Sequence, residues 1–120
     1  MKTETIDYEK DDFKAHIVVS EATVLIGARR TVLRNTRARK DERTEEYIVR
    51  ALIYPDLASP VLECEINGKT GAPTFEEFLR LPEPFSIQWE DAVYRLNPHW
   101  LPPESDEKKE SETPTISTVG

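Results

Sequence analysis

The sequence contains one cysteine, Cys64, among 120 residues, and two histidines, His16 and His99. One cysteine excludes an internal disulfide and any metal site built from several cysteines, so we expect Cys64 to be a small core residue. The histidines lie far apart with no second metal ligand beside either, and exposure or packing is the expected role of each. The sequence also lacks a glycine-rich phosphate loop and a G-x-S-x-G turn. We therefore expect no enzyme activity, no metal and no cofactor.

Long apolar runs are absent as well. The first residues, MKTETIDYEKDDF, lack the hydrophobic stretch of a signal peptide, and no segment reaches membrane-spanning length. The net charge of −7 argues against general affinity for nucleic acids or anionic membranes. We expect a soluble protein of a reducing compartment such as a bacterial cytoplasm.

The length and composition predict one domain with an unpacked end. A chain of 120 residues has room for a single core, and only 38% of its residues are hydrophobic. From Pro102 the sequence reads PPESDEKKESETPTISTVG, which holds too few apolar residues to offset the entropy of ordering it. We predict a single globular domain of residues 1–101 and a disordered acidic tail of residues 102–120.

The first third of the chain predicts a β-hairpin followed by a helix. Residues Met1–Val19 read as two extended segments around the turn Glu9–Asp12, and apolar residues alternate after the turn. Ser20 is a suitable N-cap for a helix from Ala22 to about Arg39. Apolar residues at helical spacing predict this helix: Ala22, Leu25, Ala28, Val32 and Leu33.

The middle of the chain predicts a second helix and leaves one segment open. The helix runs from Asp41 to Tyr54, where Pro55 is expected to stop it. In residues 60–66 apolar and acidic residues alternate, and the strong turn signal Asn67-Gly68 follows. This favours a strand, although a short helix beginning at Pro60 also obeys the capping rules.

The last part predicts two helices. Thr74 and Glu77 form a capping box, and a longer helix starts near Pro84 and ends at Asn97-Pro98. Its apolar stripe comprises Phe85, Trp89, Ala92, Val93 and Leu96. The expected fold is α+β and mostly helical, with an N-terminal β-hairpin followed by a small helical bundle and a disordered C-terminal tail.

A basic run stands out in this acidic chain. Residues 29–40 hold six cations and no acid, and a helix would place Arg30, Arg34 and Arg37 on one face. Such a face suits phosphate, but cations near a helix C-terminus also complement its dipole or pair with the acids that follow from Asp41. We favour a charged self-association face composed of Arg29, Arg30, Arg34 and Arg37.

Aromatic residues gather near the end of the predicted domain. Phe85, Trp89 and Tyr94 lie in the last predicted helix, where packing in the core is the simplest role. Trp100 and Leu101 follow the helix stop and lie beside prolines, so they either pack back or contact a partner. The candidate partner-binding residues are Phe85, Trp89, Tyr94, Trp100 and Leu101.

Several motifs in order resemble a known family. They are ATVLIGARRTVLR (residues 22–34), YPDL (54–57), TFEEFLRLPEPF (74–85) and W-x-x-A-V-Y-x-L-N-P-H-W (89–100). Together they resemble the tail assembly chaperones of long-tailed (siphovirus-like) bacteriophages and related prophages. The similarity covers about residues 13–101, and no single motif is diagnostic.

The resemblance implies a small protein of the host bacterial cytoplasm that is absent from the mature virion. Such chaperones bind the tape-measure protein, keep it soluble during tail morphogenesis and recruit the tail-tube protein. They act as weak homo-oligomers, and many have a longer form made by ribosomal frameshifting, which here would diverge within residues 102–120. The alternative is a small nucleic-acid-associated regulator that uses the basic face Arg29–Lys40.

Overall fold

The molecule contains a four-stranded antiparallel sheet with the strand order β1-β2-β3-β4. The computed structural model describes residues 1–101, and the predicted disordered tail, residues 102–120, lies outside the described residues. The strands are β1 (Thr3–Lys10), β2 (Phe13–Ser20), β3 (Val61–Ile66) and β4 (Lys69–Thr70). The predicted N-terminal hairpin is therefore confirmed, and β3 extends it into a larger sheet.

Short turns set the register of the sheet. Asp11 takes a positive φ of 54° in the turn that pairs Lys10 with Phe13. Asn67 and Gly68 both have positive φ values, 50° and 83°, which is the geometry of a two-residue hairpin loop. This turn and the pairing of β3 with β2 show that the open segment, residues 60–66, is a strand.

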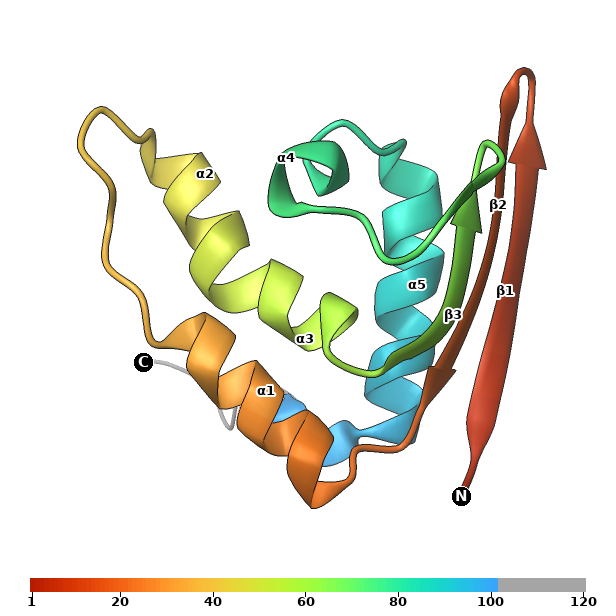
Figure 1. Cartoon of the computed structure of the whole chain (residues 1–120), viewed down its shortest axis with the longest axis horizontal. Coiled ribbons are helices and arrows are strands. Elements are labelled where there is room, and N and C mark those ends of the chain that lie inside the picture. The colour runs from red at the N-terminus through yellow and green to blue at the C-terminus, as the bar shows by residue number, and fades with distance from the viewer. Residues whose placement is uncertain (102–120) are drawn as a thin grey trace, which may run out of the picture.

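Helices occupy 47% of the described residues and strands 24%, so the predicted α+β class is confirmed, whereas the expectation of a mostly helical fold overstates the helical content. In Figure 1, α5 lies between the sheet and the α1–α3 region, so the helices and the hairpin share one core. The helical elements are α1 (Val24–Arg34), α2 (Thr44–Ile48), the π-helical turn η1 (Val49–Ile53), α3 (Tyr54–Ala58), α4 (Phe75–Phe78), α5 (Glu83–Leu96) and the 3-10 turn η2 (Pro98–Trp100).

Helix α1 is shorter than predicted at both ends. Thr23 is its N-cap, since its Oγ1 accepts a hydrogen bond from the Ile26 N–H at 3.2 Å. Ser20, the expected cap, is the buried last residue of β2. The helix ends at Arg34, not at Arg39, and Arg50 holds the non-helical segment that follows through the Thr36 hydroxyl and the Arg37 carbonyl.

The second predicted helix also has different bounds. It begins at Thr44, and the Glu46 side chain caps this end by accepting a hydrogen bond from the Arg43 N–H. The helix then continues past Pro55 to Ala58. Just before the proline the helix widens into η1, where the Tyr54 N–H bonds to the Val49 carbonyl five residues back. In a regular helix a proline clashes with the carbonyl four residues earlier and lacks the N–H that would bond to it. The wider π-turn accommodates both effects.

The core lies between the sheet and α5. Cys64 is buried there as expected, and burial raises the pKa of its thiol to about 11. Trp89 is completely buried and its indole N–H donates to the Leu57 carbonyl at 3.1 Å, which ties α5 to the end of α3. The remaining core residues from these layers are Ile6, Ala15, Ile17, Val19, Phe85, Ala92 and Val93.

Candidate protein-binding site

Two of the four residues of the predicted basic face, Arg30 and Arg34, are turned toward Asp56, whereas Arg29 and Arg37 are exposed. Asp56, in α3 directly after Pro55, has a side chain only 3% exposed. Its Oδ1 lies 2.5 Å from Arg30 Nε and 3.5 Å from Arg34 Nη1, and its Oδ2 accepts a hydrogen bond from the Tyr94 hydroxyl at 2.6 Å. The carboxylate thus links α1, α3 and α5. Burial and this hydrogen bond raise the pKa of Tyr94 above its usual range.

The other two arginines do not complete a face. Arg29 Nη1 donates to the Ser59 carbonyl at 3.1 Å, and Arg37 lies beyond the end of α1. Arg37 is held by its backbone, because its carbonyl accepts from Arg50 Nη2 at 2.7 Å. The structure therefore does not bring Arg29, Arg30, Arg34 and Arg37 together as one exposed surface. Asp56, the residue that draws two of them inward, gave no signal in the local sequence.

The aromatic candidates divide into core and surface. Phe85 and Trp89 are completely buried, so neither can contact a partner in the folded chain. Trp100 is 8% exposed and the Arg30 guanidinium lies 4.5 Å from its ring centre, so Trp100 packs back onto α1. Tyr94 is half-buried against Asp56, and Leu101 is the most exposed of the five candidates.

A second ion pair, between Arg50 and Glu42, orders the segment between α1 and α2. Arg50 Nε and Nη2 donate to the two carboxylate oxygens of Glu42 at 2.8 and 2.7 Å, a bidentate geometry. The Arg50 guanidinium also bonds to Thr36, in the same segment. The hydrogen bonds from Arg50, followed by one from the Arg39 N–H, lower the pKa of Glu42 from 4.5 to about 2.

This pair gives the first prediction, a pH-dependent loss of stability. Because the pKa of Glu42 is lowered on folding, its contribution is present above about pH 4.5 and is lost as the pH falls toward about 2. Glu42→Gln is therefore expected to be less stable than the parent at neutral pH and as stable as the parent near pH 2. Urea unfolding followed by circular dichroism at a series of pH values measures the difference. Glu9→Gln, a change at an exposed carboxylate of β1, is the control, and a difference that stays constant with pH would contradict the prediction.

An apolar groove of about 340 Å³ lies between η1, α4 and α5. Leu79 and Ile87 are 40% and 46% exposed at its edges, although both are large apolar side chains. The groove also contains Glu83, Ser86 and Glu90, and its apolar lining is Val49, Ile53, Leu57, Phe78, Leu79, Leu81 and Ile87.

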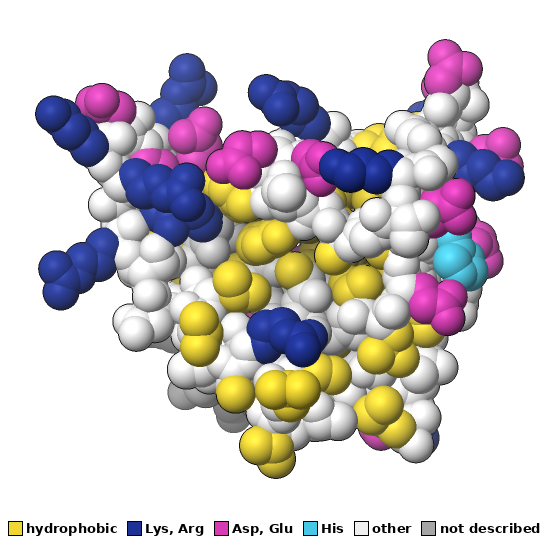
Figure 2. Space-filling view, in the orientation of Figure 1, with side chains coloured by type: hydrophobic (Ala, Val, Ile, Leu, Met, Phe, Trp, Pro, Cys, Tyr) yellow, Lys and Arg dark blue, Asp and Glu magenta, His cyan; other side chains and the backbone are white. Residues whose placement is uncertain are grey.

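The charge around this groove is acidic. Glu83 begins α5, and Glu90 lies two turns further along the same helix. Burial, followed by the nearby charges of Asp91 and Asp56, raises the pKa of Glu90. Figure 2 shows hydrophobic side chains gathered over α1, α2–α3 and α4, with most charged groups toward the edges of this view. The groove thus combines apolar walls with carboxylates.

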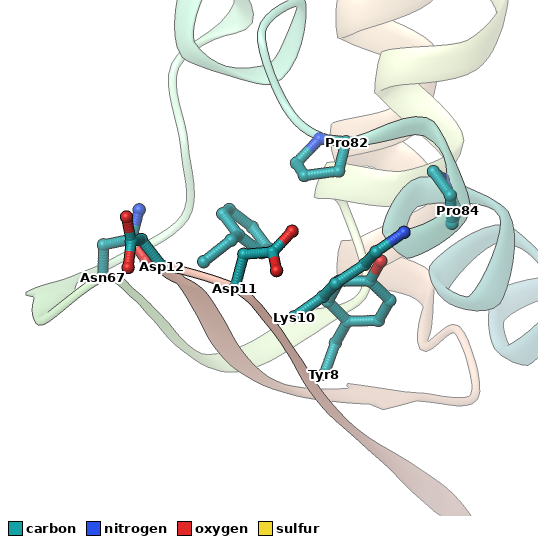
Figure 3. A pocket seen from close by; sticks show the side chains of 8 residues that line it. Tyr8, Lys10, Asp11, Asp12, Asn67, Pro82 and Pro84 are labelled. Atoms are coloured by element: carbon teal, nitrogen blue, oxygen red, sulfur yellow. The ribbon is translucent and has the colours of Figure 1, made fainter.

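A second hollow lies beside the tip of the β1–β2 hairpin. Its volume is about 490 Å³. Figure 3 shows Tyr8, Pro82 and Pro84 around it. Its charged side chains, Lys10, Asp11 and Asp12, are exposed. Within residues 1–101 there is no group of three or more potential ligands placed to hold a metal ion. In the same part of the chain, no helix has both the length and the apolar character needed to cross a membrane.

Sequence reasoning found the aromatic residues but missed the groove. Leu79 and Leu81 follow α4 and Ile87 lies in α5, and only the fold brings them beside Val49 and Ile53 of η1. Comparisons with protein-family models, with curated proteins and with solved structures find no match for this chain.

Proposed function

We propose that this protein is a tail assembly chaperone of a long-tailed bacteriophage, and that its groove holds a helical segment of the tape-measure protein. One observation carries the proposal: large apolar side chains line an open groove between three helical elements. Amphipathic helices bind such grooves through apolar anchors spaced three to four residues apart. A chaperone for an aggregation-prone helical protein needs a surface of this kind.

The chemistry of the groove defines the segment it suits. Leu79 and Ile87 offer apolar contacts, and Glu83 and Glu90 favour lysine or arginine beside the anchors of the partner. The net charge of −7 supports solubility of the complex. The preferred client segment is therefore a helix with one apolar stripe and basic flanks.

The same proposal includes the remaining partners. The chaperone recruits the tail-tube protein, works with a longer frameshifted form of itself and forms weak homo-oligomers. It acts in the host bacterial cytoplasm, without a membrane, and is absent from the mature virion. The nucleic-acid alternative is less favoured, because Arg30 and Arg34 are engaged by Asp56.

Ile87→Asp tests the groove. Co-expressed with a tape-measure protein, the parent chain is expected to keep the client soluble and to co-purify with it. The variant is expected to lose most of this binding, because a charge in an apolar contact must be desolvated. Gel analysis of the soluble and co-purified fractions measures both effects.

The matched control is Leu62→Asp, since Leu62 is 49% exposed on β3 and lies outside the groove. It is expected to retain the client. Equal client recovery with both variants would place binding elsewhere. An insoluble client with no bound parent chain would contradict the chaperone function, and salt-dependent binding of DNA or RNA would then support the regulator.

A further inference from the structure

Helix α1 presents its apolar side to solvent. Val24, Leu25 and Val32 are 92%, 68% and 73% exposed, and Ala28 is exposed between them. Leu25, Ala28 and Val32 are spaced as the apolar stripe of a helix that packs against something. The apolar side of a helix usually packs into the core, but here the opposite side of α1 packs inward, through Ile26, Arg30 and Arg34.

A second exposed apolar pair continues this surface. Ile48 and Leu52, four residues apart on α2 and η1, are 42% and 48% exposed. Figure 2 shows hydrophobic side chains over α1 and over the α2–α3 helix in the same view of the molecule. We call this surface the α1–α2 face, defined by Leu25, Ala28, Val32, Ile48 and Leu52.

The two halves of the α1–α2 face differ in charge. Arg29 flanks the α1 half, and no acid occurs between Ala22 and Lys40. Glu45 and Glu46 flank the α2 half, and Glu45 is exposed one turn before Ile48. One surface thus carries a cationic side and an anionic side, each beside an apolar ridge.

We propose that a second copy of this chain covers the α1–α2 face in a two-fold dimer, with α1 of each protomer against α2 of its partner. A two-fold axis brings the same surface of both copies together, so a face with unlike halves is complementary to itself. Packing α1 against α1 would instead place Arg29 opposite its own copy. The dimer uses a different surface from the groove and does not depend on the client.

The test measures the mass of the full chain by sedimentation and light scattering over a range of concentrations. The parent is expected to pass from monomer to dimer as its concentration rises. Val32→Asp is expected to raise the dissociation constant at least about tenfold, because it puts a charge in the centre of the contact. Val32 is exposed in the monomer, so the variant should keep its circular dichroism spectrum, and Leu62→Asp should dimerise like the parent.

Charge reversal tests the orientation. Arg29→Glu and Glu45→Arg are each expected to weaken the dimer, whereas the double variant should restore it, because each pair across the axis is again of opposite sign. A parent that stays monomeric, an open series of larger assemblies, or a double variant weaker than both single ones would overturn the proposal. Client recovery with Val32→Asp separates the two ideas: it is expected to persist, and its loss would contradict the separation of dimer face and groove.

Discussion

Asp56→Ala is expected to destabilise the protein by about 3 kcal/mol, the low end of the cost of removing one partner from a buried ion pair. The change leaves Arg30 and Arg34 without their carboxylate and the Tyr94 hydroxyl without its acceptor. The low end applies because the Arg34 side chain is 35% exposed and can regain water. Urea unfolding followed by circular dichroism measures the loss.

Two further variants sharpen this experiment. Asp56→Asn keeps an acceptor for Tyr94 but removes the charge, so its loss is expected to be smaller than that of alanine. Asp91→Ala removes an exposed carboxylate from α5 and should change stability by less than about 0.5 kcal/mol. If Asp56→Ala behaves like Asp91→Ala, Asp56 does not join the three helices as the structure indicates.

Trp89→Ala has the largest expected effect, a loss of about 3–5 kcal/mol, because it removes a completely buried indole from the core. A small domain has roughly 5–15 kcal/mol of total stability, so the variant is expected to be largely unfolded at elevated temperature. Thermal unfolding followed by circular dichroism is the measurement.

Trp89→Phe separates packing from hydrogen bonding. It keeps a ring against Phe78 and Phe85 but leaves the Leu57 carbonyl without its donor. Its expected loss is smaller than that of alanine and includes about 1–3 kcal/mol for the unsatisfied carbonyl. A folded alanine variant of parent stability would instead favour the original expectation that Trp89 contacts a partner.

Local patterns predicted the elements whose partners are close in the sequence. Alternation and the Asn67-Gly68 turn predicted β3 and its loop, and the structure has both. The capping box at Thr74 is also present, with Thr74 Oγ1 accepting from the Glu77 N–H and Glu77 accepting from the Thr74 N–H. In each case the residues that decide the geometry are within a few positions of one another.

The errors arose where distant residues decide the outcome. Periodicity indicates that α1 has an apolar side but not which side faces inward, and Asp56 reverses the usual choice by binding Arg30 and Arg34. Pro55 stops a regular helix, yet η1 lets the chain continue. The groove depends on three elements that meet only in the folded chain, so its residues gave no common signal.

The inward-facing arginines of α1 have a consequence for how this protein can diverge. The packing of α1 depends on Ile26, Arg30 and Arg34, whereas Leu25 and Val32 have little packing to lose. Substitutions at the outer positions are therefore expected to leave the stability of the folded monomer nearly unchanged. The outer side of α1 can differ in its chemistry while the three helices stay joined at Asp56.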